Sequence, residues 1–513
     1  MKKILILIIL FNYFLSFSQT TFGVASEYIL YNPNGSSTVT LIDLNGNTVK
    51  EWNCGENTAG QVHLLEDGSI LRWYDNASGS ILGGGAEGGG IQIITWDNNV
   101  VWDYEWSSNE HLQHHDCVPI KKEDGKYHVA FISWDNSSVV AQNGLTGKWP
   151  TEIIEVEPLG LNGGNVVWEW HAADHVCQDD NPNDPNYYSD CNNHPELFDV
   201  SLGGSSGGPG GPGGGPGGGS SGDWIHANGL DYNYDLNQFI FSSHYFDEFY
   251  IIDRSTTTAE AATHSGGQGM GGDILYRWGH PSNYGSSGTN YINMCHGAHW
   301  IKKGYPGNEN GENGILIFNN GENDGSSEIY EITPSMTGYN YNTPWNQTPS
   351  WTYSANGFYS VHLGGVKRLR NGNTLISEGT DGRIFEVNPA GQVVFDYDLP
   401  STGGGGPFGG GSQLSKATAY PWDYPGLSNL TSSISDINPN RINIYPNPAV
   451  NYINIKSEEN LPRELYIFNV LGKIVKNVTC NANTIKIDIS SLETGCYFIK
   501  SLNQEFKSKF IVQ

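Results

Sequence analysis

One forty-residue stretch, residues 360–399, constrains the fold of this chain more than any other. It contains four short runs rich in β-branched and aromatic residues, and turn-forming residues separate each run from the next. Asn371-Gly372 and Asp381-Gly382 fill two of the gaps, and such pairs favour tight hairpins because both residues tolerate a positive φ. The pattern predicts one four-stranded antiparallel sheet whose strands pair in chain order.

Similar groups of runs recur along the chain. Each group ends in an aromatic residue after a β-branched pair or its equivalent: Trp52, Trp102, Trp168, Trp278, Trp351 and Phe395. Such repeats are typical of a β-propeller, and the first group lacks a strand that residues 416–427 could supply, closing the ring. The sequence predicts an all-β, six-bladed β-propeller over residues 19–430, with a Gly-rich insert at 203–222; a β-sandwich is the alternative.

The two ends of the chain differ from the repeats. Residues 1–18 combine two lysines, an apolar run and a small-x-small site, which is typical of a cleaved signal peptide. That apolar run is too short to span a bilayer. Residues 431–441 are polar and predict a linker, and residues 442–513 contain alternating runs that predict a small Ig-like β-sandwich.

The composition excludes several classes of function. The formal net charge of −28 argues against nucleic acid and anionic membranes as partners. The sequence has no GxxxxGK[ST], CxxC or HExxH motif, so it predicts no metal site and no cofactor. Cys177 and Cys191 bracket an acidic loop and could close it as a disulfide. The loop, residues 179–190, is either simply solvated or a Ca²⁺ site without the full EF-hand pattern.

Histidines recur at one position of the repeat. His115, His226, His296 and His362 each stand just before or at the start of the first strand of a unit. The first strands of a propeller line its axis, so we expect these side chains to converge on a central pocket. They could cap strands, bind a metal, or transfer an anionic group through a covalent histidine. His114 is expected to point away from His115, because side chains alternate along a strand.

Motifs at these positions follow a fixed order. They are HHD at 114–116, DWIHANGLDYN at 223–233, CHGAHW at 295–300, ILIFNNG at 315–321, LRNGNTLI at 369–376, GRIFEV at 382–387 and AYPWDYPGL at 419–427. The ordered set resembles the bacterial aryl-sulfate sulfotransferase family over most of residues 22–427.

The resemblance implies a six-bladed propeller that moves a sulfuryl group from a phenolic sulfate ester to another phenol. It implies a sulfated-histidine intermediate and no nucleotide donor. In that scheme His362 is the nucleophile, and His226 and His296 hold the sulfuryl oxygens. His115, His299 and Asn228 are the expected substrate-binding residues.

Three positions depart from the family pattern. Acidic residues follow residues 319–321, where the family usually has a sulfate-binding Arg; His244 replaces another Arg, and Gly297 replaces an Asp. Losing the Arg removes a bidentate anion clamp, which Arg368 or Arg370 could restore, although strand alternation favours a surface position for them. Two alternatives therefore stay open: a non-catalytic propeller that binds ligands at the cell surface, and a metal-assisted hydrolase or lyase.

The last seventy residues carry their own motifs. YPNP at 445–448, VLGK at 470–473 and LETGCYFIK at 492–500 resemble the type A sorting domain of the type IX secretion system. The resemblance implies export by the signal peptide and then by the type IX machinery. The protein is then expected to be secreted or held at the cell surface, with no membrane insertion after signal removal. A carbohydrate-binding module is the alternative.

Overall fold

The computed structural model describes residues 28–58, 60–202, 222–322, 324–400, 412–432, 442–457, 464–469, 474–480, 482–500 and 507–513. The predicted signal peptide, and nearly all of the predicted Gly-rich insert and linker, lie outside these residues. The chain divides into two units, residues 1–427 and 428–513, which are taken in turn. None of the described helices is long and apolar enough to span a membrane.

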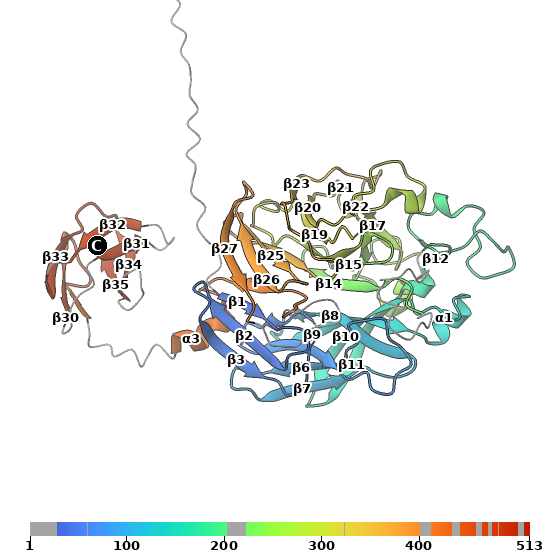
Figure 1. Cartoon of the computed structure of the whole chain (residues 1–513), viewed down its shortest axis with the longest axis horizontal. Coiled ribbons are helices and arrows are strands. Elements are labelled where there is room, and N and C mark those ends of the chain that lie inside the picture. Colours follow the sequence, from blue (N-terminus) through green and yellow to red (C-terminus); the bar gives the residue numbers. More distant parts are fainter. Residues whose placement is uncertain are drawn as a thin grey trace, which may run out of the picture. The chain divides into compact units, whose positions relative to one another are not determined.

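Five sheets of the first unit each contain four strands that pair in chain order (Figure 1). They are β4 (His63–Leu64), β5 (Ile70–Asp75), β6 (Gly89–Ile94) and β7 (Val100–Glu105); β8 (His111–Lys121), β9 (Tyr127–Asp135), β10 (Thr151–Leu159) and β11 (Gly163–His171); β14 (Ala227–Asn233), β15 (Gln238–Ser243), β16 (Glu248–Asp253) and β17 (Ile274–Trp278); β18 (Cys295–Trp300), β19 (Ile315–Asn319), β20 (Glu328–Ile332) and β23 (Trp351–Tyr353); β24 (Gly365–Arg368), β25 (Thr374–Glu378), β26 (Arg383–Val387) and β27 (Val393–Asp398). All of these pairs are antiparallel.

A sixth four-stranded sheet joins the two ends of this unit. β28 (Thr418–Tyr420) pairs with β1 (Tyr28–Tyr31), and β2 (Thr38–Asp43) and β3 (Thr48–Asn53) complete the sheet. The Tyr420 hydroxyl accepts a hydrogen bond of 2.8 Å from the Leu64 N–H, which ties the closing strand to the next sheet. The prediction that residues 416–427 supply the missing strand is confirmed, and the pairing covers the edge that β1 would otherwise expose.

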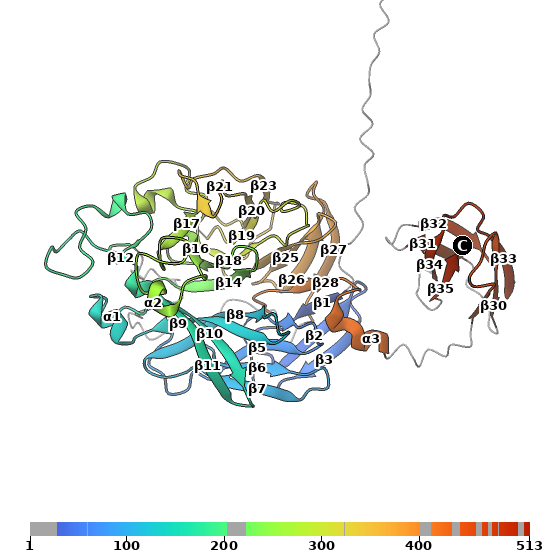
Figure 2. The same ribbon diagram turned by 180° about the vertical axis from the view of Figure 1, so that it is seen from behind.

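The remaining elements of this unit are short and lie in its connections. They are α1 (Ser138–Gln142), η1 (Ala172–Asp174), β12 (Val176–Cys177), η2 (Cys191–Asn193), β13 (Phe198–Asp199), α2 (Thr258–Ala261), η3 (Pro281–Tyr284), β21 (Met336–Thr337), β22 (Asn340–Tyr341) and η4 (Pro425–Leu427). The first unit is an all-β propeller, as predicted, and β14 lies between β8 and β18 (Figure 2).

The repeated tryptophans hold neighbouring sheets together. Trp52, Trp102 and Trp278 are buried, and their indole N–H groups donate to the carbonyls of Thr95, Gly163 and Gln347 at 3.1, 2.8 and 2.8 Å. Each acceptor belongs to the following sheet or its loops. These three tryptophans therefore fill the space between neighbouring sheets, and each fixes their spacing by one directed bond.

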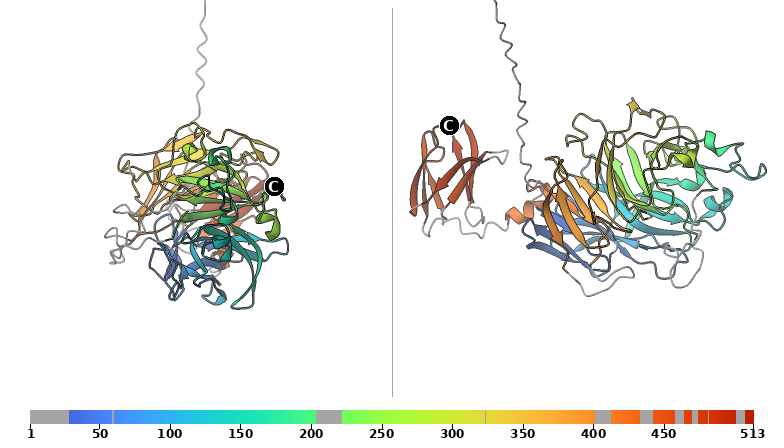
Figure 3. Two further views of the ribbon diagram at one scale, coloured as in Figure 1. Left: turned by 90° about the vertical axis from the view of Figure 1, so that its right-hand side faces the viewer. Right: turned by 45° about the horizontal axis from the view of Figure 1, so that its top comes forward.

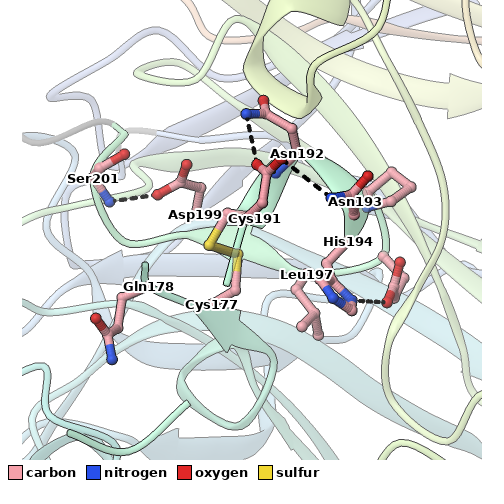
Figure 4. The surroundings of a disulfide bond; sticks show 12 residues. Cys177, Gln178, Cys191, Asn192, Asn193, His194, Leu197, Asp199 and Ser201 are labelled. Atoms are coloured by element: carbon pink, nitrogen blue, oxygen red, sulfur yellow. Dashed lines mark hydrogen bonds and ion pairs between the residues drawn. A yellow bond between two sulfur atoms is a disulfide. The ribbon is translucent and has the colours of Figure 1, made fainter. Parts of the chain in front are cut away.

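A buried ion pair fastens the insert between β11 and β14 to its neighbouring sheet. Arg277 on β17 contacts both carboxylate oxygens of Glu248 on β16, with Nε 3.0 Å from Oε1, and both side chains are almost fully buried. The same guanidinium donates to the carbonyl of Leu197 at 3.2 Å. Leu197 follows Cys191 in the sequence. Cys191 forms a disulfide with Cys177, as the sequence predicted (Figure 4).

We expect Glu248→Gln to destabilise the first unit by about 3–5 kcal/mol, because it leaves the Arg277 charge buried without a counter-ion. The measurement is urea unfolding monitored by tryptophan fluorescence. Glu66→Gln breaks the exposed Lys121–Glu66 pair and is the matched control, with little change expected. Equal effects of the two variants would contradict the prediction.

The second unit contains a short helix and two sheets that share one core (Figure 3). The helix is α3 (Ser428–Ser432), and the sheets are β29 (Ile442–Tyr445), β30 (Tyr452–Ser457) and β33 (Thr484–Asp488), and β32 (Ile474–Thr479), β31 (Glu464–Asn469), β34 (Gly495–Lys500) and β35 (Lys507–Val512). Ile453 of the first sheet and Ile467 and Phe510 of the second are fully buried in the common core. The predicted small β-sandwich is confirmed.

Candidate active site

Four imidazole rings form a row beside the inner strands: His115, His226 and His296 lie in or next to β8, β14 and β18, and His244 lies in the turn after β15. The ring centres of His115 and His226 lie 4.6 Å apart, those of His226 and His244 5.4 Å, and those of His244 and His296 5.1 Å. We refer to these four residues as the histidine cluster. Sequence reasoning placed His115, His226 and His296 together but treated His244 only as the loss of an Arg.

Irregular backbone brings these rings together. His115 and His226 have φ values of 55° and 50°, which are uncommon for residues other than Gly. The strand register shifts beside the histidines in β8, β14 and β18. Such bulges re-aim side chains, and they explain why Nδ1 of His114 lies 2.7 Å from Nδ1 of His115. The expectation that His114 points away from His115 was wrong because it assumed regular alternation.

Neighbouring polar groups orient two rings of the cluster. Nδ1 of His226 bonds to the Asp223 carboxylate, whose other oxygen accepts the Trp134 indole N–H at 2.8 Å. Nδ1 of His296 lies 2.7 Å from Oδ1 of Asn320. Because each Nδ1 is held by an oxygen, Nε2 is the nitrogen left to meet a ligand.

His362 stands beside the cluster on the loop that precedes β24. Its carbonyl accepts hydrogen bonds from Ser360 Oγ at 2.7 Å and Thr380 Oγ1 at 3.1 Å. Nδ2 of Asn320 donates to the Ser360 carbonyl at 2.8 Å, so the partner of His296 also holds this loop. His362 is half-buried, and repulsion from its protonated form would add to the lowering of the pKa values of His244 and His296.

Burial keeps His115, His244 and His296 neutral. It lowers the pKa of His296 to about 3 and those of His115 and His244 well below the usual value, and repulsion from neighbouring histidines adds to the effect. Burial also lowers the pKa of His362. At neutral pH His115, His244, His296 and His362 are therefore neutral and nucleophilic, and a bound anion would favour their protonation.

Lys416 places its ammonium group beside the cluster. Its ammonium group lies 2.7 Å from Asp116, and its charge contributes to the low pKa of His296. Sequence reasoning missed Lys416, although it stands just before β28, where the other units carry histidine. Arg368 and Arg370, the expected substitutes for the missing family Arg, pair instead with Glu331 and Asp423.

The other two expected substrate-binding residues, Asn228 and His299, lie further along the inner strands β14 and β18. Asn228 ties β14 to its neighbours: its Nδ2 donates to the Cys295 carbonyl at 2.5 Å, and its Oδ1 accepts from Ser242 at 2.7 Å. His299 lies further along β18, with Nδ1 3.0 Å from the Gly297 carbonyl. Neither makes a ring contact with the cluster among those the structure describes.

A cavity of about 530 Å³ lies at the other end of the inner strands. Its lining includes residues from the ends of β8, β14, β18 and β24, such as Lys121, Asn233, Trp300 and Arg368. None of the four cluster histidines lines it. The histidine cluster and this cavity are therefore separate features of the axis.

Two features require glycine at position 297: the left-handed backbone conformation and the close approach of the Lys416 side chain. The φ of Gly297 is +63°, and a Cβ there would lie 2.9 Å from Cε of Lys416. We expect Gly297→Ala to cost about 2 kcal/mol of stability in urea unfolding, from the left-handed backbone and the contact together. Gly304→Ala is the matched control, because its φ is +84° with no atom within 4 Å of the Cβ, and about 1 kcal/mol is expected. Equal costs would show that Lys416 moves aside freely.

Comparisons with known proteins were made for both units. The family model for arylsulfotransferase (ASST) matches residues 99–382, and that for a secretion system C-terminal sorting domain matches residues 443–513. No curated protein matches the chain.

Several solved structures resemble the chain. A protein of unknown function from Bacteroides caccae has a TM-score of 0.39 and 12% identity, over 73% of this chain and 94% of that one. The Cps50 (Swd1) β-propeller domain of Myceliophteria thermophila has a TM-score of 0.36 and 9% identity, over 74% and 87%. A streptogramin B lyase has a TM-score of 0.32 and 11% identity, over 74% and 86%.

The first of the two family models spans more than half of the sequence. Its range contains all four histidines of the cluster and His362. This chain belongs to the arylsulfotransferase family.

Proposed function

We propose that this protein moves a sulfuryl group from a phenolic sulfate ester to another phenol through a sulfated histidine, without a cofactor. The observation that carries the proposal is the row of closely spaced imidazoles beside His362, within the range of the family match. Transfer of such a group needs little covalent chemistry beyond placement and charge stabilisation, and this site offers both.

His362 is the proposed nucleophile. One ring nitrogen attacks sulfur, the N–S bond forms as the S–O bond to the donor breaks, and the leaving phenolate takes the proton that the other ring nitrogen releases. The acceptor phenol then returns a proton to that second nitrogen and attacks sulfur, which breaks the N–S bond and restores the neutral imidazole. His226 and His296 take up protons from solvent when the anionic donor binds and hold the sulfuryl oxygens, and His115 lies next to them.

Tyr245 is a further candidate to contact the donor. Its ring centre lies 4.8 Å from that of His226, and its buried hydroxyl has no hydrogen-bond partner among the described residues. Burial raises its pKa, so the hydroxyl keeps its proton and can donate to a sulfuryl or phenolic oxygen.

Mass spectrometry of the purified protein tests the proposal. An aryl sulfate is added without an acceptor, and the expected product is one sulfated peptide that contains His362. Adding a phenol should discharge it. A folded protein that releases no phenol and gains no adduct would support the ligand-binding alternative. In that outcome the missing family Arg is the physical reason, because Lys416 is already paired with Asp116.

The second unit is proposed to direct export. Its sandwich and the match to a sorting domain support handling by a type IX secretion machinery, and secretion or attachment to the cell surface. Removing residues 428–513 should leave the first unit folded and retain it inside the producing cell. Fractionation of both forms in the same host measures this.

A further inference from the structure

One side chain from each strand of a single sheet meets at one end of that sheet. His111 lies on β8, Asp135 on β9, Glu152 on β10 and His171 on β11. In the strand register His111 is opposite Asp135, and Glu152 is opposite His171. The four residues therefore form a row across the sheet, and none of them belongs to the histidine cluster.

The possible ligand atoms of this row are close together. Nδ1 of His111 lies 2.9 and 3.0 Å from the two Glu152 oxygens. Nδ1 of His171 lies 2.8 Å from Asp135 Oδ2 and 3.6 Å from Glu152 Oε2. One atom each of His111, Asp135 and Glu152 falls within 4.8 Å of the other two. Two imidazole nitrogens with two carboxylates form a donor set that suits Zn²⁺.

The charge of this row is not balanced by Lys or Arg. The Asp135 and Glu152 side chains are fully buried, and among the described residues their ion-pair partners are only His111 and His171. Two buried carboxylates need about two positive charges nearby. Either both imidazoles are protonated, or one divalent cation sits between neutral imidazoles.

Outer groups already orient the carboxylates. The Trp106 indole N–H donates to Glu152 Oε1 at 3.1 Å, and the Ser137 N–H donates to Asp135 Oδ1 at 2.8 Å. Hydrogen bonds of this kind fix ligating oxygens around metal ions. They leave the remaining oxygens directed at the two imidazoles.

A second carboxylate on the same sheet provides a contrast. Glu155, also on β10, is fully buried and contacts His128 Nδ1 at 2.7 Å, Lys122 Nζ at 2.8 Å and Arg254 Nε at 2.6 Å. Its charge is satisfied by a Lys and an Arg. The sheet thus uses ordinary salt bridges at Glu155 and only imidazoles at the row of His111, Asp135, Glu152 and His171.

We propose that His111, Asp135, Glu152 and His171 bind one divalent cation of the zinc type. The ion holds the ends of four adjacent strands in register, as a closed structural site. Sequence reasoning predicted no metal site because the known metal-binding motifs have ligands close together in the sequence. Here each of four strands supplies one ligand. The proposal is independent of sulfuryl transfer at His362.

The test uses the full chain, stripped with EDTA and then dialysed against ZnCl₂. Elemental analysis and calorimetric titration should show that the unchanged protein and the control Glu155→Gln bind zinc at this site. The variants Glu152→Gln and Asp135→Asn should not. Zinc should raise the midpoint of thermal unfolding of the unchanged protein and of Glu155→Gln, but not that of Glu152→Gln. Asp273→Asn measures separately any ion held by His175, His264 and Asp273, a second group of possible ligands.

A measurement on the unchanged protein covers the case in which the variants do not fold. Co²⁺ added to the stripped protein should give the visible absorption of a tetrahedral nitrogen and oxygen site, without a thiolate band, and Zn²⁺ should abolish it. Folded protein that binds neither ion, or that loses no zinc in Glu152→Gln, would overturn the proposal. The two imidazoles would then carry the balancing protons.

Discussion

Replacing His362 with Asn is expected to lower aryl-sulfate turnover by at least about a thousandfold, a loss of about 4 kcal/mol of transition-state stabilisation. Asn keeps a polar side chain of moderate size but provides no ring nitrogen that can carry a sulfuryl group. The fold should survive, because the loop is held through the His362 carbonyl by Ser360 and Thr380. Release of the donor phenol, measured with and without an acceptor, is the assay.

His280→Gln is the matched control for this experiment. His280 lies on a loop outside the cluster, with Nδ1 2.9 Å from Asn283 Oδ1, and turnover should be unchanged. Normal turnover by His362→Asn would remove the nucleophile assignment. The sulfated peptide would then identify which histidine of the cluster carries the group instead.

Much of the fold follows from the sequence because its signals are local. Paired turn residues such as Asn371-Gly372 mark hairpins. The aromatic residue in the last strand of each repeat marks the contact with the next sheet. Trp102 shows why this residue recurs: it fills the gap between sheets and donates to Gly163. The closing strand was also predictable, since the first of the repeated groups of strands lacked one strand.

The candidate site was predictable only where the repeat is regular. His115, His226 and His296 occupy one repeat position and do converge. His114 reaches His115 only because His115 has a positive φ, which no motif announces. Lys416 could have been found, because it precedes the closing strand as histidine precedes the others.

Contacts between residues far apart in the sequence explain which features of the site could not be predicted from the sequence. Arg368 looked free to replace the missing family Arg, but it pairs with Glu331 and its guanidinium lies 4.8 Å from the Trp351 ring centre. The row of His111, Asp135, Glu152 and His171 draws one residue from each of four strands. Such sets depend on strand register, which the local pattern fixes only approximately.

The first unit is expected to lose stability steeply as the pH falls from 7.5 to 5.5. Six buried or half-buried histidines have lowered pKa values in the folded state, mainly because of burial: His63 (to about 4), His114, His115, His244, His296 (to about 3) and His299. In the unfolded chain each imidazole titrates near pH 6.5. Below pH 6.5 the unfolded state binds protons that the folded state does not bind, so acid favours unfolding.

The size of this effect follows from the number of groups. Each such histidine costs about 1.4 kcal/mol per pH unit below 6.5, so six of them cost about 8 kcal/mol at pH 5.5. Groups with raised pKa values oppose the loss. Although burial lowers it, contacts with carboxylates raise the pKa of His171 to about 10 and also raise that of His111, so acid favours their folded state; burial raises the pKa of Asp247 to about 6, and that penalty shrinks as acid protonates the carboxyl. A net loss of several kcal/mol remains, a large fraction of the stability of a typical domain.

Urea unfolding at pH 7.5, 6.5 and 5.5 measures this loss, and its slope against pH counts the protons taken up on unfolding. His63→Gln should reduce the proton count by about one, because Gln keeps a polar side chain near the Cys117 carbonyl but does not titrate. A flat dependence between pH 7.5 and 5.5 would mean that the folded protein also binds these protons. The cluster would then be cationic, and the proposed neutral nucleophile at neutral pH would lose its electrostatic basis.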